Sequence, residues 1–363
     1  MSFSFGFSGN DYEDVEDTNQ SNIQAITSDN GKFLINPLDS QHLLNDPVIQ
    51  PQIEEYEINL KSLQNVRLSF EQFMTPETNS ILFRRELFDI KHQLMSENNS
   101  SAENELDILI NEDLKKNVYE GGLKSWECSI DVVDTLVKKS KYTSILPQLN
   151  LNDIRYVVEL GCGTALPTEY IFAQYISQNS NQGIHFILAD YNSSVLRLAS
   201  LPNLIITWAK LTLTQDQWSN LQRCNDENIP IVNDELLLTE QLIDSFYQDM
   251  KQRNIQLSLI SGSWGRKFNT LLYSLMSNVN NDQVLVITSE TIYQPENLPL
   301  ISETLIDINN RFNNNSHTLV AAKDIYFGVG GSILDFQDYL TRRNINFNIF
   351  KVNAGLKRSI VYI

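Results

Sequence analysis

Short apolar runs alternate, from residue 151 to residue 363, with stretches in which apolar residues recur every three or four positions. A short apolar run predicts a buried strand, and the wider spacing predicts an amphipathic helix. Strands that alternate with helices favour a mostly parallel sheet with helices on both faces. We therefore predict an α/β core with seven strands, at residues 155–159, 184–190, 256–261, 283–289, 318–326, 346–352 and 357–363.

Two helices are predicted between the later strands of this core. The first spans residues 299–312, where the apolar residues share one face. The second spans residues 333–343, and Ser332 precedes it with Asp335 three positions later, which is the spacing of a capping box.

Residues 203–255 are longer than a simple crossover between two strands requires. We predict that they form an insertion beside the sheet, with a strand at residues 204–208 and a helix at residues 242–250.

The chain before the core divides by composition into two parts. Residues 1–60 hold an acidic tract from Asp11 to Asp17 among Asn, Ser, Asp and Pro, and bury too little apolar surface to offset the entropy of ordering. We predict an acidic disordered leader, whose opening (Ser2 to Phe7) is either a flexible end or a hook for a partner. Residues 61–150 are predicted to be a helical N-terminal extension that covers the core, with helices at residues 81–94, 106–118 and 123–137.

Charge and cysteine usage limit the class of partner and the compartment. The formal net charge is −18, which argues against a nucleic acid as the main partner, because an acidic surface repels phosphate and attracts basic proteins. Cys128, Cys162 and Cys224 are far apart and form no zinc-spaced cluster, which indicates a reducing compartment and no metal site. With no apolar run of about 18 residues and no basic-then-apolar leader, we expect a soluble intracellular protein without membrane contact.

The first predicted strand ends in Glu159-Leu160-Gly161-Cys162-Gly163, a glycine turn that leads into a helix. Glycines at this point remove side chains, so that a ligand can lie against bare backbone at a helix N-terminus. The third glycine of dinucleotide-binding turns is absent. The turn therefore indicates a nucleoside site without a pyrophosphate, which suits S-adenosylmethionine better than NAD. A tight turn without a ligand is the alternative.

Asp190 ends the second predicted strand, in Asp190-Tyr191-Asn192. A carboxylate at this place can accept hydrogen bonds from both ribose hydroxyls of a nucleoside. The alternative is a turn that caps the following helix. The glycine turn upstream favours ribose binding.

Two further segments follow later strands, where open α/β sheets bind their ligands. Gly262, Ser263 and Trp264 offer bare backbone and one ring to an adenine, or form a loop around a core tryptophan. Glu290 and Tyr293 either face one cleft or form a helix cap and a half-buried tyrosine. No Asn/Asp-Pro-Pro-aromatic tetrad is present in this second segment, which argues against methylation of the exocyclic amine of adenine.

The segment Tyr326-Phe327-Gly328 places two aromatic residues before a glycine-rich loop. We expect Tyr326 and Phe327 to reach the lip of the cleft and to sandwich a planar acceptor group, while Gly328 lets a substrate backbone approach. A tight turn from strand to helix is the alternative.

Taken together, these motifs resemble the fungal protein-histidine N-methyltransferases of the seven-strand class I type, which modify a large-subunit ribosomal protein. The resemblance covers residues 80–363. It rests on the glycine turn, on Asp190 to Asn192, and on the segments Glu120 to Cys128, Gly262 to Trp264, Ser289 to Tyr293, Tyr326 to Gly331 and Gly355 to Arg358.

The resemblance implies a Rossmann-like methyltransferase sheet, S-adenosylmethionine as methyl donor, and methylation of the imidazole nitrogen distal to the main chain. From position and chemistry we assign Glu290 and Tyr293 to catalysis, and Tyr326, Phe327 and Gly328 to substrate binding. The predicted cofactor-binding residues are Trp126, Glu159, Gly161, Cys162, Gly163, Asp190, Asn192, Gly262, Ser263, Trp264 and Ser289.

We expect a monomer of the cytoplasm and nucleus with a basic large-subunit ribosomal protein as its substrate and a role in ribosome biogenesis or translation. Two alternatives stay open. One is a class I methyltransferase that acts on protein lysine or a small molecule. The other is a non-catalytic acidic binder or chaperone of ribosomal proteins.

Overall fold

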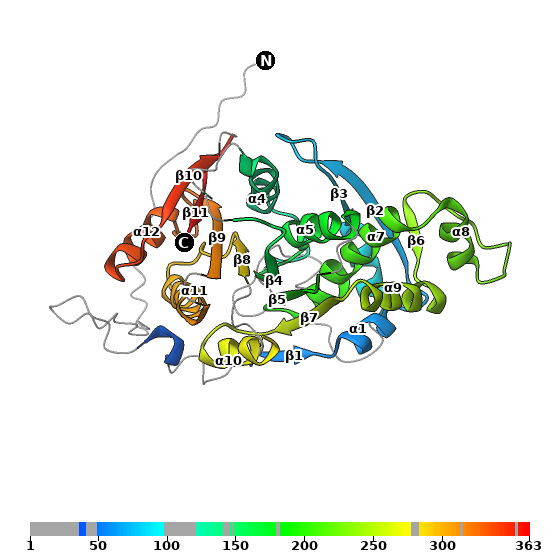
Figure 1. Ribbon diagram of the computed structural model, residues 1–363, viewed down its shortest axis with the longest axis horizontal. Helices are drawn as coiled ribbons and strands as arrows, with labels where there is room; N and C mark the ends of the chain where they lie inside the picture. The colour runs from blue at the N-terminus through cyan, green and yellow to red at the C-terminus, as the bar shows by residue number, and fades with distance from the viewer. Residues whose placement is uncertain are drawn as a thin grey trace, which may run out of the picture. The chain divides into compact units, whose positions relative to one another are not determined.

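A mixed sheet of eight strands forms the centre of the computed structural model (Figure 1). The strand order is β1-β7-β5-β4-β8-β9-β11-β10. The strands are β1 (Gln52–Glu54), β4 (Ile154–Leu160), β5 (Ile184–Asp190), β7 (Ile255–Ser261), β8 (Gln283–Ser289), β9 (Ser316–Lys323), β10 (Asn348–Val352) and β11 (Arg358–Tyr362).

The structure describes a large part of the chain from Asn36 onward, with several gaps. The described residues are 36–40, 49–97, 121–140, 146, 149–178, 182–276, 283–312, 315–352 and 355–363. The predicted helix at 106–118 and the acidic tract of the leader lie outside the described residues.

The seven predicted strands are confirmed, although β9 ends at Lys323 and not at the predicted residue 326, and β1 adds an eighth strand at the edge. Strands β7, β5, β4, β8 and β9 run parallel, β11 is antiparallel to both β9 and β10, and β1 is antiparallel to β7. Strand β4 lies between β5 and β8, where the strand order reverses, and ligands bind beyond such a point in open α/β sheets. The glycine turn after β4 is therefore at the expected place for a binding site.

Helices cover both faces of the sheet, as predicted (Figure 1). On one face, α4 (Glu127–Val137), α5 (Leu166–Ser177), α7 (Leu201–Thr212) and α9 (Glu240–Gln252) pack in series. On the other face, α11 contacts both of its neighbours; this group is α10 (Arg266–Leu275), α11 (Leu298–Phe312) and α12 (Ile333–Arg342). Ser332 caps α12, since its hydroxyl accepts a hydrogen bond of 3.0 Å from the Asp335 N–H.

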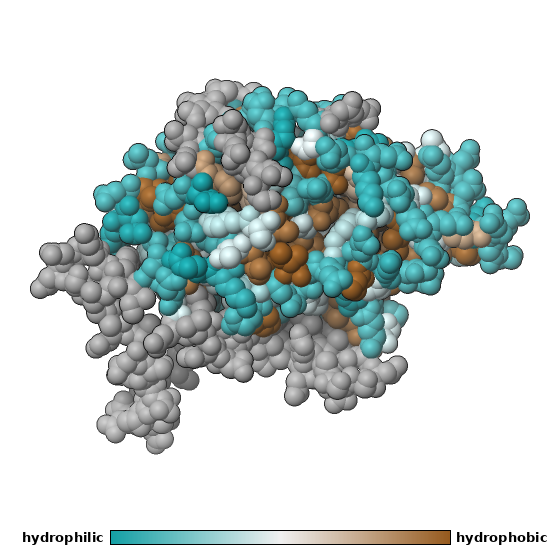
Figure 2. Space-filling model, turned by 60° about the horizontal axis from the view of Figure 1, so that its bottom comes forward, coloured by the Kyte–Doolittle hydropathy of each residue, from teal (hydrophilic) through white to brown (hydrophobic). Residues whose placement is uncertain are grey.

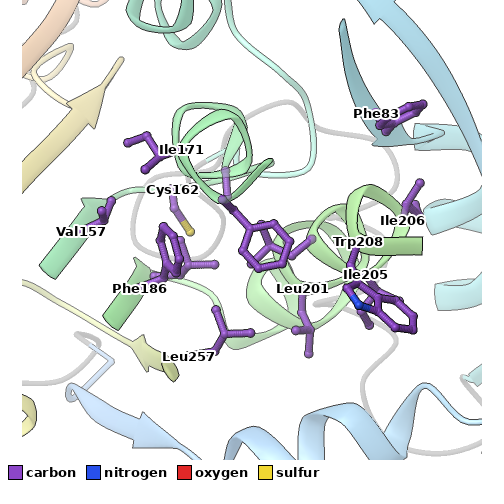
Figure 3. Close-up of a cluster of buried hydrophobic side chains, with 14 of the residues drawn as sticks. Phe83, Val157, Cys162, Ile171, Phe186, Leu201, Ile205, Ile206, Trp208 and Leu257 are labelled. Atoms are coloured by element: carbon purple, nitrogen blue, oxygen red, sulfur yellow. The ribbon is translucent and has the colours of Figure 1, made fainter. Parts of the chain in front are cut away.

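The main core fills the space between the sheet and the α5–α7 layer. Figure 3 shows Phe186 of β5 and Leu257 of β7 on the same side as Leu201 and Trp208 of α7. The Phe186 ring meets Phe172 edge to face at 5.7 Å. When the chain folds, the apolar side chains of this layer are removed from contact with water, and this burial stabilises the fold. Figure 2 shows the molecule with the bottom of Figure 1 turned forward, and this face is largely hydrophilic, with hydrophobic residues gathered near its centre.

A second, three-stranded sheet in the order β3-β2-β6 was not predicted. The remaining elements near the N-terminus and in the insertion are η1 (Pro37–Asp39), α1 (Tyr56–Ser62), β2 (Arg67–Met74), β3 (Ile81–Arg85), α2 (Leu87–Glu97), η3 (Lys138–Ser140), α6 (Ser193–Val195), η4 (Leu196–Ser200), α8 (Gln215–Arg223) and β6 (Glu235–Leu237).

The predicted helix at 81–94 is wrong in its first part, because strand β3 precedes helix α2. The outer edge of β3 is stabilised by buried side chains from other elements. The Phe83 N–H donates to Glu169 Oε1 at 2.7 Å, and the Arg85 N–H donates to Asn203 Oδ1 at 2.8 Å. These long-range partners satisfy backbone donors that a helix would satisfy locally.

The predicted strand at 204–208 is also wrong, because these residues belong to helix α7. Every residue from Leu201 to Ala209 is buried, so the segment has no solvent-exposed face, and its two polar residues, Asn203 and Thr207, form hydrogen bonds inside the protein. The β-branched Ile205 and Ile206 then favour a strand by composition alone.

Disorder was predicted for all of residues 1–60, and this is wrong for residues 36–40, which contain η1, and for residues 49–60. Strand β1 pairs with β7, and α1 follows it. The pairing uses backbone hydrogen bonds along the free edge of β7, which require no apolar pattern in the added strand. Among the described helices, none is both long and apolar enough to cross a membrane.

Candidate functional site

A cavity of about 850 Å³ lies beyond the carboxyl ends of β4, β5, β7, β8 and β9. Its lining includes every predicted site residue except Glu159, Asn192 and Gly328. Segments from seven different parts of the chain meet there, and these are residues 121–129, 161–164, 190–191, 262–264, 289–300, 323–329 and 355–357. The fold thus brings the motifs of the sequence analysis into one site.

The glycine turn after β4 has a backbone that glycine suits. Gly161 has φ +62° and Gly163 has φ +51°, both in the left-handed region. A Cβ on Gly161 would lie 2.6 Å from Thr291 Cγ2 and 3.6 Å from the Trp264 ring. A Cβ on Gly163 would lie 3.1 Å from the Gly122 carbonyl oxygen. The turn therefore leaves bare backbone in a narrow space, as a cradle for a ligand requires.

Glu159 lies behind this turn instead of in the cavity lining. Its Oε2 accepts hydrogen bonds from the Thr168 N–H at 3.0 Å and from Thr168 Oγ1 at 2.5 Å. Burial raises the pKa of Glu159 to about 8, an effect that the Thr168 hydrogen bonds oppose and the Asp190 carboxylate reinforces. Glu159 thus links the end of β4 to the first turn of α5 through hydrogen bonds, and it thereby holds the glycine turn between them in position.

Asp190 connects the second strand to the same turn. Its Oδ2 accepts a hydrogen bond of 3.0 Å from the Gly163 N–H, and its Oδ1 accepts one of 3.2 Å from the Asn192 N–H. Asn192 is at the N-cap of α6 and its side chain makes no capping hydrogen bond, so the turn of the alternative interpretation is present without its side-chain cap. The carboxylate is 5% exposed and lines the cavity.

A further part of the cavity wall, next to the glycine turn and Asp190, is formed by Gly262, Ser263 and Trp264. Gly262 has φ +103°, and a Cβ there would lie 2.7 Å from the Gln50 carbonyl oxygen. The Ser263 N–H donates to the Ile49 carbonyl oxygen at 2.9 Å. Residues just before β1 therefore hold this wall in place, which the sequence analysis did not predict because it assigned them to the leader.

Glu290 supplies a second carboxylate to the site, and its side chain is 8% exposed. Its backbone has φ +58°, and its N–H donates to the Ala321 carbonyl oxygen at 2.9 Å. Its Oε2 accepts a hydrogen bond of 2.6 Å from the Tyr326 hydroxyl. Its Oε1 is buried and accepts no hydrogen bond from any residue that the structure describes. An acceptor atom of this kind is available to an N–H group that enters the cavity.

Lys323 is a site residue that the sequence analysis missed. Its Nζ lies 3.7 Å from Glu290 Oε1 and 3.4 Å from Glu127 Oε2. It also lies 5.3 Å from the centre of the Trp126 ring. The sequence feature that could have identified it is a lysine directly after the apolar run of β9, where this strand ends at the site. Its ammonium group offsets the negative charge of the buried Glu290.

Tyr326 and Phe327 do not form the expected sandwich. The Tyr326 ring packs edge to face on Tyr293, with centroids 6.2 Å apart, whereas Phe327 is 83% exposed. Burial, together with the Glu290 carboxylate, raises the pKa of Tyr326, so its hydroxyl keeps its proton and donates it in a hydrogen bond. Gly328 is exposed, and a Cβ there would meet no atom within 4 Å.

The residues present fit a nucleoside with a small charged group better than they fit a metal ion. The bare backbone at Gly161 and Gly163, the carboxylate of Asp190 and the ring of Trp264 are arranged around one space. Within the described residues, no group of His, Cys, Asp and Glu side chains is arranged to hold a metal ion.

Comparisons with known proteins agree on one family. The chain is 51% identical to histidine protein methyltransferase 1 of Saccharomyces cerevisiae over 379 aligned positions, which cover 100% of this chain and 98% of the relative. It is 32% identical to histidine protein methyltransferase 1 of Schizosaccharomyces pombe, with 77% and 76% of the two chains covered. It is 31% identical to the Bos taurus homologue, with 69% and 56% covered.

Solved structures give weaker matches. The rRNA methyltransferase aviRa from Streptomyces viridochromogenes has a TM-score of 0.36 and 10% identity, with 73% of this chain and 96% of that chain covered. The N-terminal domain of human METTL16 in complex with SAH has a TM-score of 0.34 and 7% identity, with 85% and 90% covered. Scores this low carry no argument. No family model matches the chain.

Proposed function

The chain belongs to the histidine protein methyltransferase 1 family, and on this basis we propose that it methylates the distal imidazole nitrogen of a histidine in a basic large-subunit ribosomal protein. It is a methyltransferase, and its methyl donor is S-adenosylmethionine. The observation that carries the proposal is the buried Oε1 of Glu290 on the wall of the cavity, which accepts no hydrogen bond from the described residues and has the Lys323 ammonium group 3.7 Å away.

The residues that would hold the donor come from three strand ends. The Gly161–Gly163 backbone offers a shelf, Asp190 offers a carboxylate for ribose hydroxyls, and Trp264 offers a flat wall. When bound, S-adenosylmethionine supplies an electrophilic methyl group on a sulfonium. The remaining task of the protein is to orient the acceptor toward that group.

Glu290 is placed to select the tautomer of the acceptor. A neutral imidazole carries one N–H and one lone pair, and the group that accepts from the N–H decides which nitrogen keeps the lone pair. If Glu290 Oε1 accepts the N–H of the proximal nitrogen, the distal nitrogen keeps its lone pair and is the nucleophile. The same carboxylate then stabilises the positive charge that the ring acquires on methylation.

A strong general base is not required for this chemistry. The pKa of a free histidine side chain is about 6.5, so that much of it is neutral near neutral pH. Orientation of two reacting groups can contribute ~7–11 kcal/mol to a rate. We therefore assign Glu290 and its partners Tyr326 and Lys323 to orientation and to charge balance.

The choice of a basic protein substrate rests on charge and on the resemblance of the motifs. The chain has a formal net charge of −18. An acidic body attracts a basic ribosomal protein over a distance of about 10 Å at moderate salt. A lysine or a small molecule fits less well as the group that is methylated. Neither requires a carboxylate that accepts a hydrogen bond from one ring nitrogen and leaves the second ring nitrogen free.

The test uses the full chain and large-subunit ribosomal proteins from cells that lack the enzyme. After incubation with S-adenosylmethionine, mass spectrometry should find one methylated histidine with the methyl group on the distal nitrogen. Methylation of lysine, or of the proximal nitrogen, would overturn the proposed chemistry. If histidine methylation occurred only in proteins that do not belong to the ribosome, the proposed substrate would be wrong.

A further inference from the structure

Four exposed apolar side chains surround the opening of the cavity, and we call them the mouth patch. They are Phe327 (83% exposed), Leu356 (57%), Ile325 (52%) and Val329 (48%). All four line the cavity. None of the other large apolar side chains that are exposed in the described part of the chain does so. Apolar surface gathered at one opening marks a site of interaction, whereas scattered residues do not.

The loop that carries most of the mouth patch is held in one shape. The Tyr326 N–H donates to the Gly331 carbonyl oxygen at 2.9 Å, and the Gly330 N–H donates to the Tyr326 carbonyl oxygen at 3.0 Å. The Gly331 N–H donates to the Tyr293 carbonyl oxygen at 2.9 Å, which fixes the loop to the wall of the cavity. An apolar surface that is already ordered loses little entropy when a partner binds.

Two consecutive residues of this loop belong to the acceptor site and to the mouth patch. Tyr326 is directed inward, with its hydroxyl on Glu290, while the next residue, Phe327, is almost fully exposed. A histidine that reaches Glu290 therefore has its own chain neighbours beside Phe327 and Leu356. The occupant of the mouth patch is the stretch of substrate main chain and side chains on either side of that histidine.

Acidic and basic side chains balance each other in the cavity lining, unlike in the protein as a whole. Asp190, Glu290 and Asp324 line the cavity together with Lys124, Lys323 and Lys357, although the chain carries a net charge of −18. A lining in which the charges balance does not attract lysine or arginine next to the acceptor histidine in the way that the acidic body does. Long-range attraction and local selection thus act on different parts of the same substrate.

From these observations we propose that the mouth patch selects a histidine whose immediate neighbours in the substrate are apolar or aromatic. This inference rests on the proposed function and deepens it, since it defines the substrate segment that the site accepts. The basic residues that make the substrate attractive to the acidic body lie farther from the histidine.

The test replaces the mouth patch in the full-length protein and uses a matched control. The variant Phe327→Ala/Leu356→Ala removes two members of the patch. The control Phe88→Ala/Leu334→Ala removes the same residue types at 78% and 62% exposure, on α2 and α12, outside the cavity lining. The acceptor is the large-subunit ribosomal protein fraction from cells that lack the enzyme.

We expect kcat/KM for the acceptor to fall about tenfold or more in the mouth variant, since apolar anchors at the centre of an interface dominate binding. Donor affinity in calorimetry should stay unchanged in both variants, which shows that the fold is intact. Equal kcat/KM in mouth and control variants would overturn the inference.

The modified residue itself gives the second readout. Mass spectrometry should place an apolar or aromatic residue directly before or after the methylated histidine. Lysine or arginine on both sides would overturn the inference while leaving the proposed function in place. If the unaltered enzyme labels no histidine at all in this fraction, the proposed function fails, and the inference fails with it.

Discussion

The hydroxyl of Tyr326 donates a hydrogen bond of 2.6 Å to Glu290 Oε2, and this bond occupies one oxygen of a carboxylate that lines the cavity. The other oxygen, Oε1, is buried and, as far as the described residues extend, accepts no hydrogen bond. Tyr326 thus fixes the carboxylate in one orientation and leaves one defined acceptor. The proposal that this enzyme selects a histidine tautomer depends on this arrangement.

Glu290→Gln should lower kcat by about 100-fold with donor affinity unchanged. A glutamine keeps the shape but loses the negative charge that stabilises the developing imidazolium. The measurement is the methylation rate at saturating donor, with calorimetry for donor binding. Glu303→Gln is the matched control, because Glu303 is also buried and accepts from a tyrosine, Tyr339, at 2.8 Å but lies outside the cavity lining. An equal loss of donor binding in Glu290→Gln would contradict the assignment.

Tyr293→Phe tests the other residue predicted to be catalytic. The Tyr293 ring supports Tyr326 through their edge-to-face contact, and a phenylalanine preserves that contact. The variant lacks the Tyr293 hydroxyl, so kcat should fall by about tenfold or more, with donor affinity unchanged. A rate equal to that of the unaltered enzyme would remove Tyr293 from the catalytic residues and leave it as a packing partner.

Gly161→Ala should weaken donor binding by about tenfold or more. Alanine is strained at φ +62°, and its Cβ would lie 2.6 Å from Thr291 Cγ2. Titration calorimetry with S-adenosylmethionine measures the loss. Adding Thr291→Ser removes Cγ2 and keeps the hydroxyl, which is hydrogen-bonded to Thr288 at 2.7 Å, so the double variant should recover part of the affinity. Donor binding by Gly161→Ala at the unaltered affinity would show that the turn is not the donor shelf.

Asp190→Asn should weaken donor binding by 10- to 100-fold, roughly the value of hydrogen bonds to a charged group. The asparagine retains the shape of the aspartate but lacks the charge and one pair of acceptor sites. Asp307→Asn serves as the control, since this carboxylate accepts from Asn269 and Tyr273 outside the cavity lining. Unchanged affinity in Asp190→Asn would exclude Asp190 as the ribose ligand.

Stability should depend on pH through His185. Its Nε2 is 2.8 Å from Ser258 Oγ, and burial lowers its pKa to about 4 from an ordinary value of 6.5. The unfolded chain therefore binds a proton on this histidine below about pH 6.5, while the folded protein does not, so stability falls as pH decreases toward 4. Between about pH 7 and about pH 5 the loss amounts to about 2 kcal/mol.

His185→Gln removes this contribution, and urea unfolding of both proteins at the two pH values measures it. Burial raises the pKa of Glu159 and of Glu169 to about 8, so these two groups destabilise the fold as pH increases, in the opposite sense. Their contribution is common to both proteins and cancels in the comparison. An identical pH dependence in both proteins would contradict the account of His185.

The arrangement of the core could be predicted from the sequence because its strands are apolar and separated by clear turns. Asp190 ends such a strand, Gly262 and Glu290 each follow one, and the rule that ligands bind beyond strand ends placed all three in one site. Predictions at this level require only local pattern and topology. Such predictions are correct where a given residue type can occupy only one kind of position in the fold.

Other features depend on contacts that a single sequence does not display. The strand β3 is stabilised by Glu169 and Asn203, which are 86 and 118 residues away from their partners Phe83 and Arg85. The Ile49 carbonyl that supports Ser263 comes from a segment without any apolar pattern. In both cases long-range hydrogen bonds override local preference.

The central claim is most directly tested by mass spectrometry of large-subunit ribosomal proteins from cells that lack this chain and are complemented with either the unaltered protein or Glu290→Gln. The account predicts that one histidine loses its methyl group without the chain, regains it with the unaltered protein, and stays largely unmodified with Glu290→Gln. A histidine methylation pattern that is the same in all of these cells would contradict it.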